Sequence, residues 1–204
     1  WSMAGCQAYQ WAAQFPDMVS SILPFCASAK TSIHNHVFLE GVKAALTADK
    51  NWNKGNYQSP PIIGLKAFGR VYAGWAFSQD FFRQELFKKI GFNTAEELLL
   101  DWEKDHAKNW DANDLLAKLK TWQMADISSG PIYNNNFEKA LKSISANTIL
   151  MPCNQDLYFR TKDNEIESKH IKNSVIRPID SPFGHCAANP GNDKNFELQL
   201  DKNI

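Results

Sequence analysis

The sequence lacks the features that would point to a nucleic-acid-binding or membrane-spanning protein. Basic and acidic residues number 22 each, so the formal net charge is zero and no long-range field draws in nucleic acid or an acidic membrane. No uninterrupted apolar run approaches the roughly 20 residues of a membrane span, and no charged start followed by an apolar block marks a signal peptide. We therefore expect a soluble, cytoplasmic protein whose partners are small molecules, with no nucleic acid and no membrane.

Cysteine is scarce and scattered. No C-x-x-C pair occurs, a pattern that fits neither a zinc site nor a small disulfide framework. We therefore expect reduced thiols. The four cysteines are Cys6, Cys26, Cys153 and Cys186.

The histidines give no metal-binding pattern either. His34 and His36 are two residues apart in a polar loop with no third ligand nearby, so solvated side chains are the better interpretation and we expect no metal site. His106 and His170 lie in polar helical stretches, which predicts that both are on the surface.

Helices and strands alternate at both ends of the chain. Predicted helices cover residues 5–14, 37–49, 136–143 and 163–170, and predicted strands cover 19–27, 147–152 and 174–179. Alternating helices and strands favour a parallel sheet covered by helices. The predicted fold class is therefore α/β.

The middle of the chain differs from both ends in its tryptophan content and in the absence of predicted strands. Five of the seven tryptophans fall between residues 51 and 126, and the segments 61–77, 79–90, 94–109 and 112–124 all have helical periodicity. We expect a helical subdomain at 51–127, inserted between core segments at 1–50 and 128–204. Most of its tryptophans are expected to pack in its core.

The chain opens on a serine in a recognisable setting. The run Trp1-Ser2-Met3-Ala4-Gly5 matches the second half of a nucleophile elbow, G-x-S-x-G, in which a sharp strand-to-helix turn exposes the serine oxygen. Ala4 stands where the second glycine is usual, and Gly5 follows it. The alternative is that Ser2 simply caps a helix.

An aspartate and a histidine follow two of the predicted strands. Asp156 comes after the strand at 147–152, and His185 follows the strand at 174–179. The order Ser, Asp, His is that of α/β-hydrolases, and open parallel sheets carry functional groups at strand ends. Each residue alone is more often structural, as a turn former or a packed histidine. The three together favour a triad of Ser2, Asp156 and His185.

The chain from Trp1 to about Pro190 resembles the homoserine O-acetyltransferase-like branch of the α/β-hydrolase superfamily. The resemblance implies an α/β-hydrolase fold with a helical lid at 51–127. It also implies that strands preceding the nucleophile are absent from this chain, which we expect to be truncated. The residues that carry the resemblance are Ser2-Met3-Ala4-Gly5, Gln7-Ala8, Trp11-Ala12, Phe15-Pro16-Asp17, Thr47 to Asn53, Pro61, Gly64 to Ala67, Arg70, Asp111 to Leu116, Asp156 to Phe159 and Gly184-His185.

The resemblance further implies ping-pong acyl transfer through an acyl-serine, with acyl-CoA as the co-substrate and no bound cofactor. His185 would take the proton of Ser2, Asp156 would orient the imidazole, and the backbone N–H of Met3 would stabilise the oxyanion. Transfer to water, which would make the protein an esterase, and an inactive or binding fragment remain alternatives. The partners would be a small-molecule acyl donor and acceptor, and a second copy in a homodimer formed through the lid.

Two positions concern the acceptor. The homoserine enzymes have an acidic residue directly after the base, where this chain has Cys186, so homoserine is not expected as the acceptor. Arg70 matches a lid arginine that could hold a carboxylate. It could equally belong to an ion pair.

Overall fold

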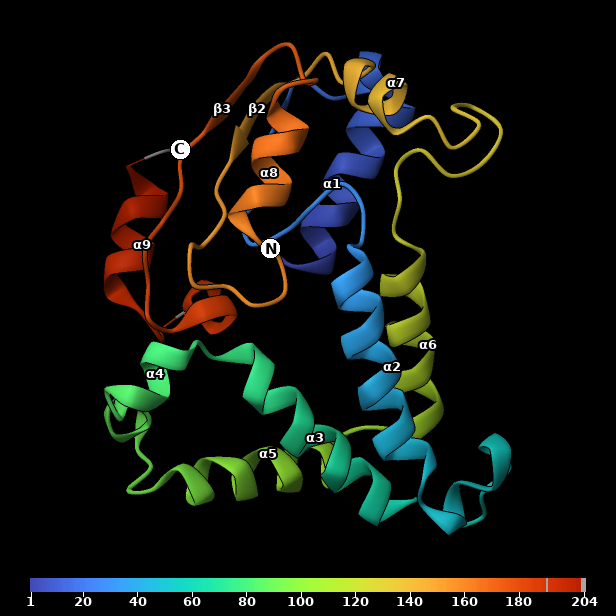
Figure 1. The fold of residues 1–204 in the computed structure, drawn as a ribbon, viewed down its shortest axis with the longest axis vertical. Coiled ribbons are helices and arrows are strands. Elements are labelled where there is room, and N and C mark those ends of the chain that lie inside the picture. The colour runs from blue at the N-terminus through green and yellow to red at the C-terminus, as the bar shows by residue number, and fades with distance from the viewer. Residues whose placement is uncertain (190, 203–204) are drawn as a thin grey trace. The chain divides into compact units, whose positions relative to one another are not determined.

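The computed structural model describes residues 1–189 and 191–202, and it divides into two compact units (Figure 1). One unit combines Trp1–Thr31 with Ala125–Ile204, and the other comprises Ser32–Met124. The first holds the strands and is called the α/β unit below. The second is called the helical unit. None of the helices among the described residues is long and apolar enough to span a lipid bilayer.

The α/β unit is built on a small parallel sheet. The strand order is β1-β2-β3, with Ile22 paired to Thr148 and Leu150 paired to Ile176. Isolated bridges between Phe25 and Met151 and between Cys153 and Ile179 continue the pairing past the strand ends. The predicted parallel sheet is thus confirmed. Its strands are β1 (Ser21–Ile22), β2 (Asn147–Leu150) and β3 (Ser174–Ile176).

Strand β1 is much shorter than the predicted strand over 19–27. Pro24 lies within that stretch and has no N–H to donate to a ladder, although its carbonyl accepts from the Met151 N–H at 3.1 Å. Past Pro24, Phe25 forms an isolated bridge with Met151, and the Cys26 N–H donates to the Met151 carbonyl at 3.1 Å. Cys26 has a φ of 47°, which turns the chain away from the sheet.

Helices cover the sheet of the α/β unit. Three of them, α1, α7 and α8, match predicted helices within two or three residues, whereas α9 was not predicted. Helix α9 is capped by Asp193, whose side chain accepts hydrogen bonds from the N–H groups of Asn195 and Phe196. The helices are α1 (Met3–Gln14), α7 (Phe137–Lys142), α8 (Thr161–Ser168) and α9 (Lys194–Asp201), and the 3-10 helices are η1 (Pro16–Met18) and η4 (Gly184–Ala188).

The core of this unit joins α1 to the sheet. Tyr9, Ala12 and Ala13 of α1 are fully buried, and they belong to one apolar cluster with Ile22 of β1 and Leu150 of β2. These α1 positions recur at three- and four-residue spacing, so they form one face of the helix. The face fixes how α1, and therefore the residue at its start, lies on the sheet.

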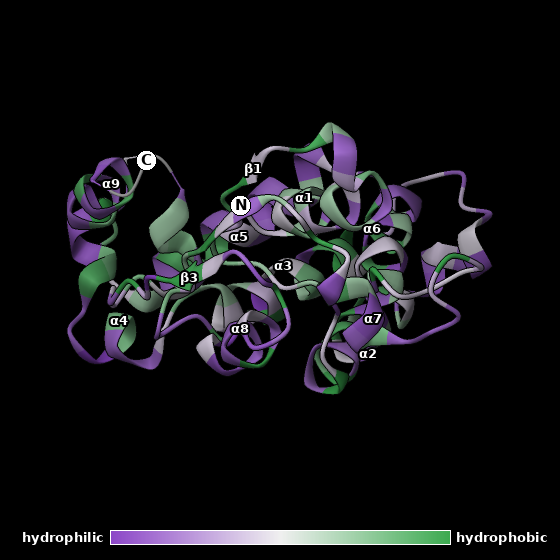
Figure 2. Ribbon diagram, turned by 90° about the horizontal axis from the view of Figure 1, so that it is seen from above, coloured by the Kyte–Doolittle hydropathy of each residue, from purple (hydrophilic) through white to green (hydrophobic). Residues whose placement is uncertain are grey.

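In the helical unit, α3 packs against both α2 and α5, and α6 lies along α2 (Figure 1). Figure 2 shows hydrophilic and hydrophobic residues on most of the helices, as expected where only one face is buried. The elements are α2 (Ile33–Thr47), η2 (Lys50–Gly55), α3 (Ile62–Ala76), α4 (Gln79–Arg83), η3 (Leu86–Ile90), α5 (Ala95–Asn109) and α6 (Ala112–Met124).

Two details of the helical unit differ from the predicted elements. The unit starts at Ser32 rather than near residue 51, because α2 packs on α3, and α2 begins early because the Ser32 side chain caps it by accepting from the Asn35 N–H at 3.1 Å. The single helix predicted over 79–90 is broken at Glu85, whose φ is 51°. The break lets both Phe81 and Phe87 be buried, with ring centroids 6.5 Å apart.

Several residues behind the family resemblance serve the architecture of this unit. Asp49 caps η2 through the Asn51 N–H, and its other oxygen accepts from the Gly64 N–H at 3.0 Å. Asn113 donates to the Gly55 carbonyl at 2.9 Å. These contacts tie the ends of α2, α3 and α6 together, so the motifs at 47–53 and 111–116 are explained by folding.

Candidate active site

Ser2 occupies a sharp turn at the start of α1. Its φ is 57° and its ψ is −137°, a region that costs a residue with a Cβ of the order of 1–3 kcal/mol and is a recurrent feature of functional sites. The Ser2 N–H points to the carbonyls of Phe25 and Cys26, at 3.4 and 3.2 Å. The side chain makes no capping hydrogen bond to α1, so the helix-cap alternative is wrong.

Gly5 lets α1 approach the segment that follows β1. A Cβ on Gly5 would lie 2.4 Å from the Cβ of Ala27, far inside van der Waals contact. Packing therefore requires a glycine here, one position after the place where the motif G-x-S-x-G has its second glycine.

Replacement of Gly5 by alanine is expected to destabilise the protein by about 1–3 kcal/mol, because α1 or the segment at Ala27 must move to admit the methyl group. The free energy of unfolding in urea measures the effect. Gly41→Ala in α2 is the matched control, because a Cβ there meets no atom within 4 Å and should be neutral or stabilising. Equal stability of the two variants would contradict the close packing at Gly5.

The side chains of Ser2, His185 and Asp156 form one hydrogen-bonded chain within the α/β unit. The His185 Nε2 lies 3.0 Å from the Ser2 Oγ, and the His185 Nδ1 lies 2.7 Å from the Asp156 Oδ2. Asp156 is fully buried, and His185 is 7% exposed. The three residues that sequence order brought together are thus adjacent in space. A serine, a histidine and an aspartate in this arrangement have the geometry that proton transfer from the serine to the imidazole requires.

Both oxygens of Asp156 are engaged. Oδ1 accepts from the N–H groups of Tyr158 and Phe159, at 2.7 and 3.2 Å, while Oδ2 faces His185. The carboxylate is held by the backbone that follows it, in a turn after β2. Its orientation toward the imidazole is therefore fixed before any substrate binds.

Aromatic rings surround the His185 imidazole. The ring of Tyr158 meets it edge to face at 4.9 Å between centroids, and Trp1 and Phe159 lie at 5.5 and 5.6 Å. The 3-10 helix η4, which carries His185, is anchored by the segments on either side of it. Ser181 donates to Asp193 at the start of α9, and the side chain of Asn192 donates to the Cys186 carbonyl at 3.0 Å.

A candidate oxyanion donor lies beside the serine. The N–H of Met3 belongs to the first residue of α1 and has no preceding helical carbonyl to bind. Such N–H groups at a helix start favour negative charge. The N–H of Ala4, by contrast, donates to the Trp1 carbonyl at 3.1 Å. Met3 is therefore the donor that the elbow leaves available.

Cys186 directly follows His185, within reach of the charge of Asp156. Burial raises the pKa of its thiol to about 12, and the Asp156 carboxylate adds to that shift. Cys186 therefore remains a neutral thiol and supplies no counter-charge for an ammonium group.

Arg70 is engaged in ion pairs within the helical unit. Its guanidinium binds the Glu96 carboxylate through two nitrogens, at 2.7 and 3.1 Å, and its Nε donates to Glu103. Both carboxylates come from α5, and together they raise the pKa of Arg70. The geometry matches the ion-pair interpretation of this arginine.

Cys26, Asp156 and His185 place potential metal-ligand atoms within 4.8 Å of one another. Asp156 and His185 are hydrogen-bonded to each other, however, and burial raises the pKa of the Cys26 thiol well above its ordinary value. A metal ligand must be deprotonated. The cluster fits a proton-handling site better than a metal site.

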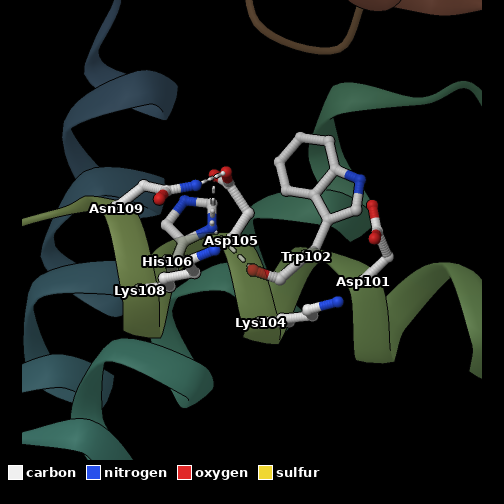
Figure 3. Close-up of a pocket in the computed structure, with 7 residues that line it drawn as sticks. All are labelled: Asp101, Trp102, Lys104, Asp105, His106, Lys108 and Asn109. Atoms are coloured by element: carbon white, nitrogen blue, oxygen red, sulfur yellow. Dashed lines mark hydrogen bonds and ion pairs between the residues drawn. The ribbon is translucent and has the colours of Figure 1, made fainter.

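A separate shallow pocket lies on α5 of the helical unit (Figure 3). The polar groups along it bind one another: the Asn109 amide donates to Asp105 at 2.8 Å, and the His106 Nδ1 lies 2.8 Å from the Trp102 carbonyl. It holds no serine or cysteine. We assign the pocket no chemistry.

The prediction that His106 lies on the surface is wrong. The side chain is buried, its ring stacks on Trp102 with centroids 5.8 Å apart, and burial lowers its pKa. Gly69 of α3 makes room, because a Cβ there would lie 2.9 Å from the His106 Nδ1. The polar neighbours of His106 hid this burial. The spacing of Trp102, His106 and Trp110 by four residues was the available signal.

Comparison with known proteins yields relatives of two kinds, although no family model matches the chain. A probable esterase of Corynebacterium glutamicum is 30% identical, and an ethyl acetate hydrolase of Pseudomonas veronii is 31% identical. Both alignments cover 100% of this chain and 58% of the relative. A homoserine O-acetyltransferase of Chloroherpeton thalassium is 29% identical over 90% of this chain and 49% of its own. The chain thus spans about half the length of these relatives.

Solved structures give the same two kinds of neighbour. An acetylester hydrolase from Corynebacterium glutamicum superposes with a TM-score of 0.92 at 30% identity, covering 99% of this chain and 58% of the other. A homoserine O-acetyltransferase from Bacillus anthracis superposes with a TM-score of 0.79 at 25% identity, covering 97% and 58%. The homologues of this chain are therefore esterases and homoserine O-acetyltransferases of the α/β-hydrolase superfamily.

Proposed function

We propose that the protein hydrolyses esters of short carboxylic acids, acetyl esters above all, through an acyl-serine on Ser2. The observation that carries the proposal is the continuous hydrogen-bonded chain from Ser2 through His185 to Asp156. The names of the relatives at 30% and 31% identity support the substrate class. No bound cofactor is needed for this chemistry.

Each step uses a group already in position. The His185 Nε2 accepts the Ser2 proton as Oγ attacks the ester carbonyl, and the Met3 N–H stabilises the oxyanion. His185 then returns the proton to the leaving alkoxide, which departs as the alcohol. A water molecule attacks the acyl-serine as His185 takes one of its protons, and His185 then returns that proton to the Ser2 Oγ as the carboxylic acid is released. Asp156 stabilises the imidazolium in both halves.

A second candidate is transfer of the acyl group to an alcohol, and the homoserine O-acetyltransferase relatives favour it. The two reactions share the acyl-serine and differ only in whether water or an alcohol takes the acyl group. Exclusion of water decides between them. In the transfer reaction the helical unit would act as a lid over the site and as the surface of a homodimer, and acyl-CoA would serve as a donor.

The partition of the acyl group tests both candidates. With p-nitrophenyl acetate in the presence of a neutral alcohol, we expect free acetate as the main product. An acetylated alcohol as the main product would favour the second candidate, and absence of both products would contradict the acyl-serine proposal.

The acceptor preference is tested at Cys186. An ammonium group in a partly buried site needs an opposite charge, so homoserine is expected to be a poor acceptor. Cys186→Asp should raise kcat/KM for homoserine, relative to a neutral alcohol of similar size, by about five- to tenfold. Cys186→Asn is the matched control, because it has nearly the same shape and no charge. Efficient use of homoserine by the unmodified protein would show that another residue supplies the charge.

A further inference from the structure

Glu167 is a buried carboxylate that the proposed mechanism does not use. It lies on α8, is 2% exposed, and forms no ion pair with a lysine or arginine among the described residues. Three hydrogen bonds replace a counter-ion. The Ala29 N–H donates to Oε1 at 2.7 Å, and Tyr9 and Asn164 donate to Oε2 at 2.7 and 2.8 Å. A buried carboxylate without a cation is rare and needs an explanation.

The donors come from the parts of the chain that shape the nucleophile turn. Tyr9 lies two turns after Ser2 on α1, and Figure 1 shows α1 and α8 next to each other. Ala29 ends the segment that follows β1. The Asn164 amide also donates to the Ala27 carbonyl at 3.0 Å. Glu167 and Asn164 thus form hydrogen bonds both to α1 and to the segment that follows β1.

That segment is in direct contact with the elbow. The carbonyls of Phe25 and Cys26 receive the Ser2 N–H, and the Ala27 Cβ occupies the space in front of Gly5. A shift of residues 25–29 would therefore move Ser2 itself. The geometry of Ser2 depends on how firmly this segment and α1 are held together.

Helix α8, which carries Glu167 and Asn164, begins shortly after Asp156 in the chain. Arg160, at the start of α8, donates through Nη1 to the backbone carbonyl of Asp156 at 2.8 Å. Through α8, one short element links the turn that carries Asp156 to the turn that carries Ser2.

We propose that Glu167, with Tyr9 and Asn164, is a positioning cluster that holds α1 and the segment 25–29 at the distance that keeps Ser2 in reach of His185. Glu167 touches neither substrate nor the reacting atoms. This inference rests on the proposed acyl-serine chemistry, which it deepens by naming what aligns the nucleophile.

The cluster fits the ionised form of Glu167. All three partners donate, and a protonated carboxyl group would have to turn one of its oxygens into a donor. Burial raises the pKa of Glu167 to about 7, and the charge of Asp163 on α8 adds to that shift. Cys6 and Tyr9 face Glu167 from α1, and burial raises the pKa of each. Activity should therefore fall as the pH drops below about 7 and Glu167 gains its proton.

Stability should change in the opposite direction. The folded-state pKa of about 7 lies above the ordinary value of 4.5, so folding favours the protonated form. The contribution of Glu167 to stability is complete below pH 4.5 and is lost as the pH rises toward 7. Glu167→Gln should flatten this slope.

Glu167→Gln tests the cluster directly. The amide keeps the shape but places an N–H₂ against groups that also donate. We expect kcat for ester hydrolysis to fall by about tenfold or more with KM little changed, since a misplaced nucleophile costs turnover. The acid limb of the pH profile should lose one ionisation. Glu165→Gln, on the same helix but paired at the surface with Lys162, is the matched control and should keep normal kinetics.

Tyr9→Phe is the second variant, because it removes one donor with little change of volume. Loss of that hydrogen bond should raise the pKa of Glu167 further, so the acid limb of kcat should move to higher pH. An unchanged limb in both variants would overturn the positioning role. If the unmodified protein hydrolyses no ester, the proposed function fails; if it does, and Glu167→Gln has normal kcat, only this inference fails.

Discussion

The Ser2→Ala variant is expected to lose all covalent labelling by a fluorophosphonate probe. Its kcat for ester hydrolysis should fall by about 10⁶, the order of loss that follows removal of a triad serine. The reason is that the Ser2 Oγ is the atom that His185 Nε2 faces at 3.0 Å. A hydroxyl without a base in reach stays protonated and is a poor nucleophile.

The substitution should leave the fold intact. Alanine has the same Cβ as serine, so the strain at a φ of 57° is unchanged, and the Ser2 Oγ makes no capping bond that would be lost. The loss of activity would then be due to removal of the nucleophile and not to unfolding. Thermal unfolding of the variant checks this point.

Ser174→Ala provides the control for labelling. Ser174 is partly buried at the start of β3, and its hydroxyl is engaged with the carbonyls of Ser168 and Ile171 at 3.1 and 2.9 Å. This variant should be labelled at the normal rate. Labelling that persists in Ser2→Ala would disprove the assignment of the nucleophile.

The proximity of Ser2, Asp156 and His185 could be predicted because its signal is local and chemical. Ser2 with Gly5 marks a tight turn, and Asp156 and His185 each follow a predicted strand. Parallel strands bring such ends to one edge of a sheet, so order along the chain was enough to place the three residues together. No sequence signal gave the distances between them.

Contacts that depend on distant packing escaped prediction. Glu167 looked like one charged residue in a polar helix, and its burial depends on donors more than a hundred positions away. His106 was hidden in the same way, since its burial requires Gly69 on another helix. Polar neighbours along the chain predict exposure only where no second element packs on the same face.

Local rules explain the misplaced boundaries. The Ser32 cap that starts α2 and the proline that shortens β1 are both visible in the sequence, but the apolar pattern of 37–49 and 19–27 favours different bounds. The tryptophans predict a helical unit that starts near residue 51, whereas the packing of α2 on α3 extends the unit back to Ser32.

Asp156→Asn should slow ester hydrolysis by about 10⁴ while leaving the fold in place. Oδ1 accepts from two backbone N–H groups, so the side-chain oxygen of asparagine must take that position. Its N–H₂ group then faces the His185 Nδ1, which has to become an acceptor. The imidazole proton moves to Nε2, and the nitrogen that should receive the Ser2 proton carries one already.

The tautomer argument separates this variant from a general loss of charge. Asp180→Asn is the control, because Asp180 is exposed on the chain segment that leads to His185, and its removal should leave turnover within about twofold, as expected for a surface change of ±0.5 kcal/mol. The measurement is kcat for p-nitrophenyl acetate in both variants, with thermal unfolding as the check on folding. A loss of less than about tenfold in Asp156→Asn, set against the 10⁴ expected, would mean that another carboxylate orients the base. Asp180 would then be the first candidate, and a large loss of kcat in Asp180→Asn would identify it as that carboxylate.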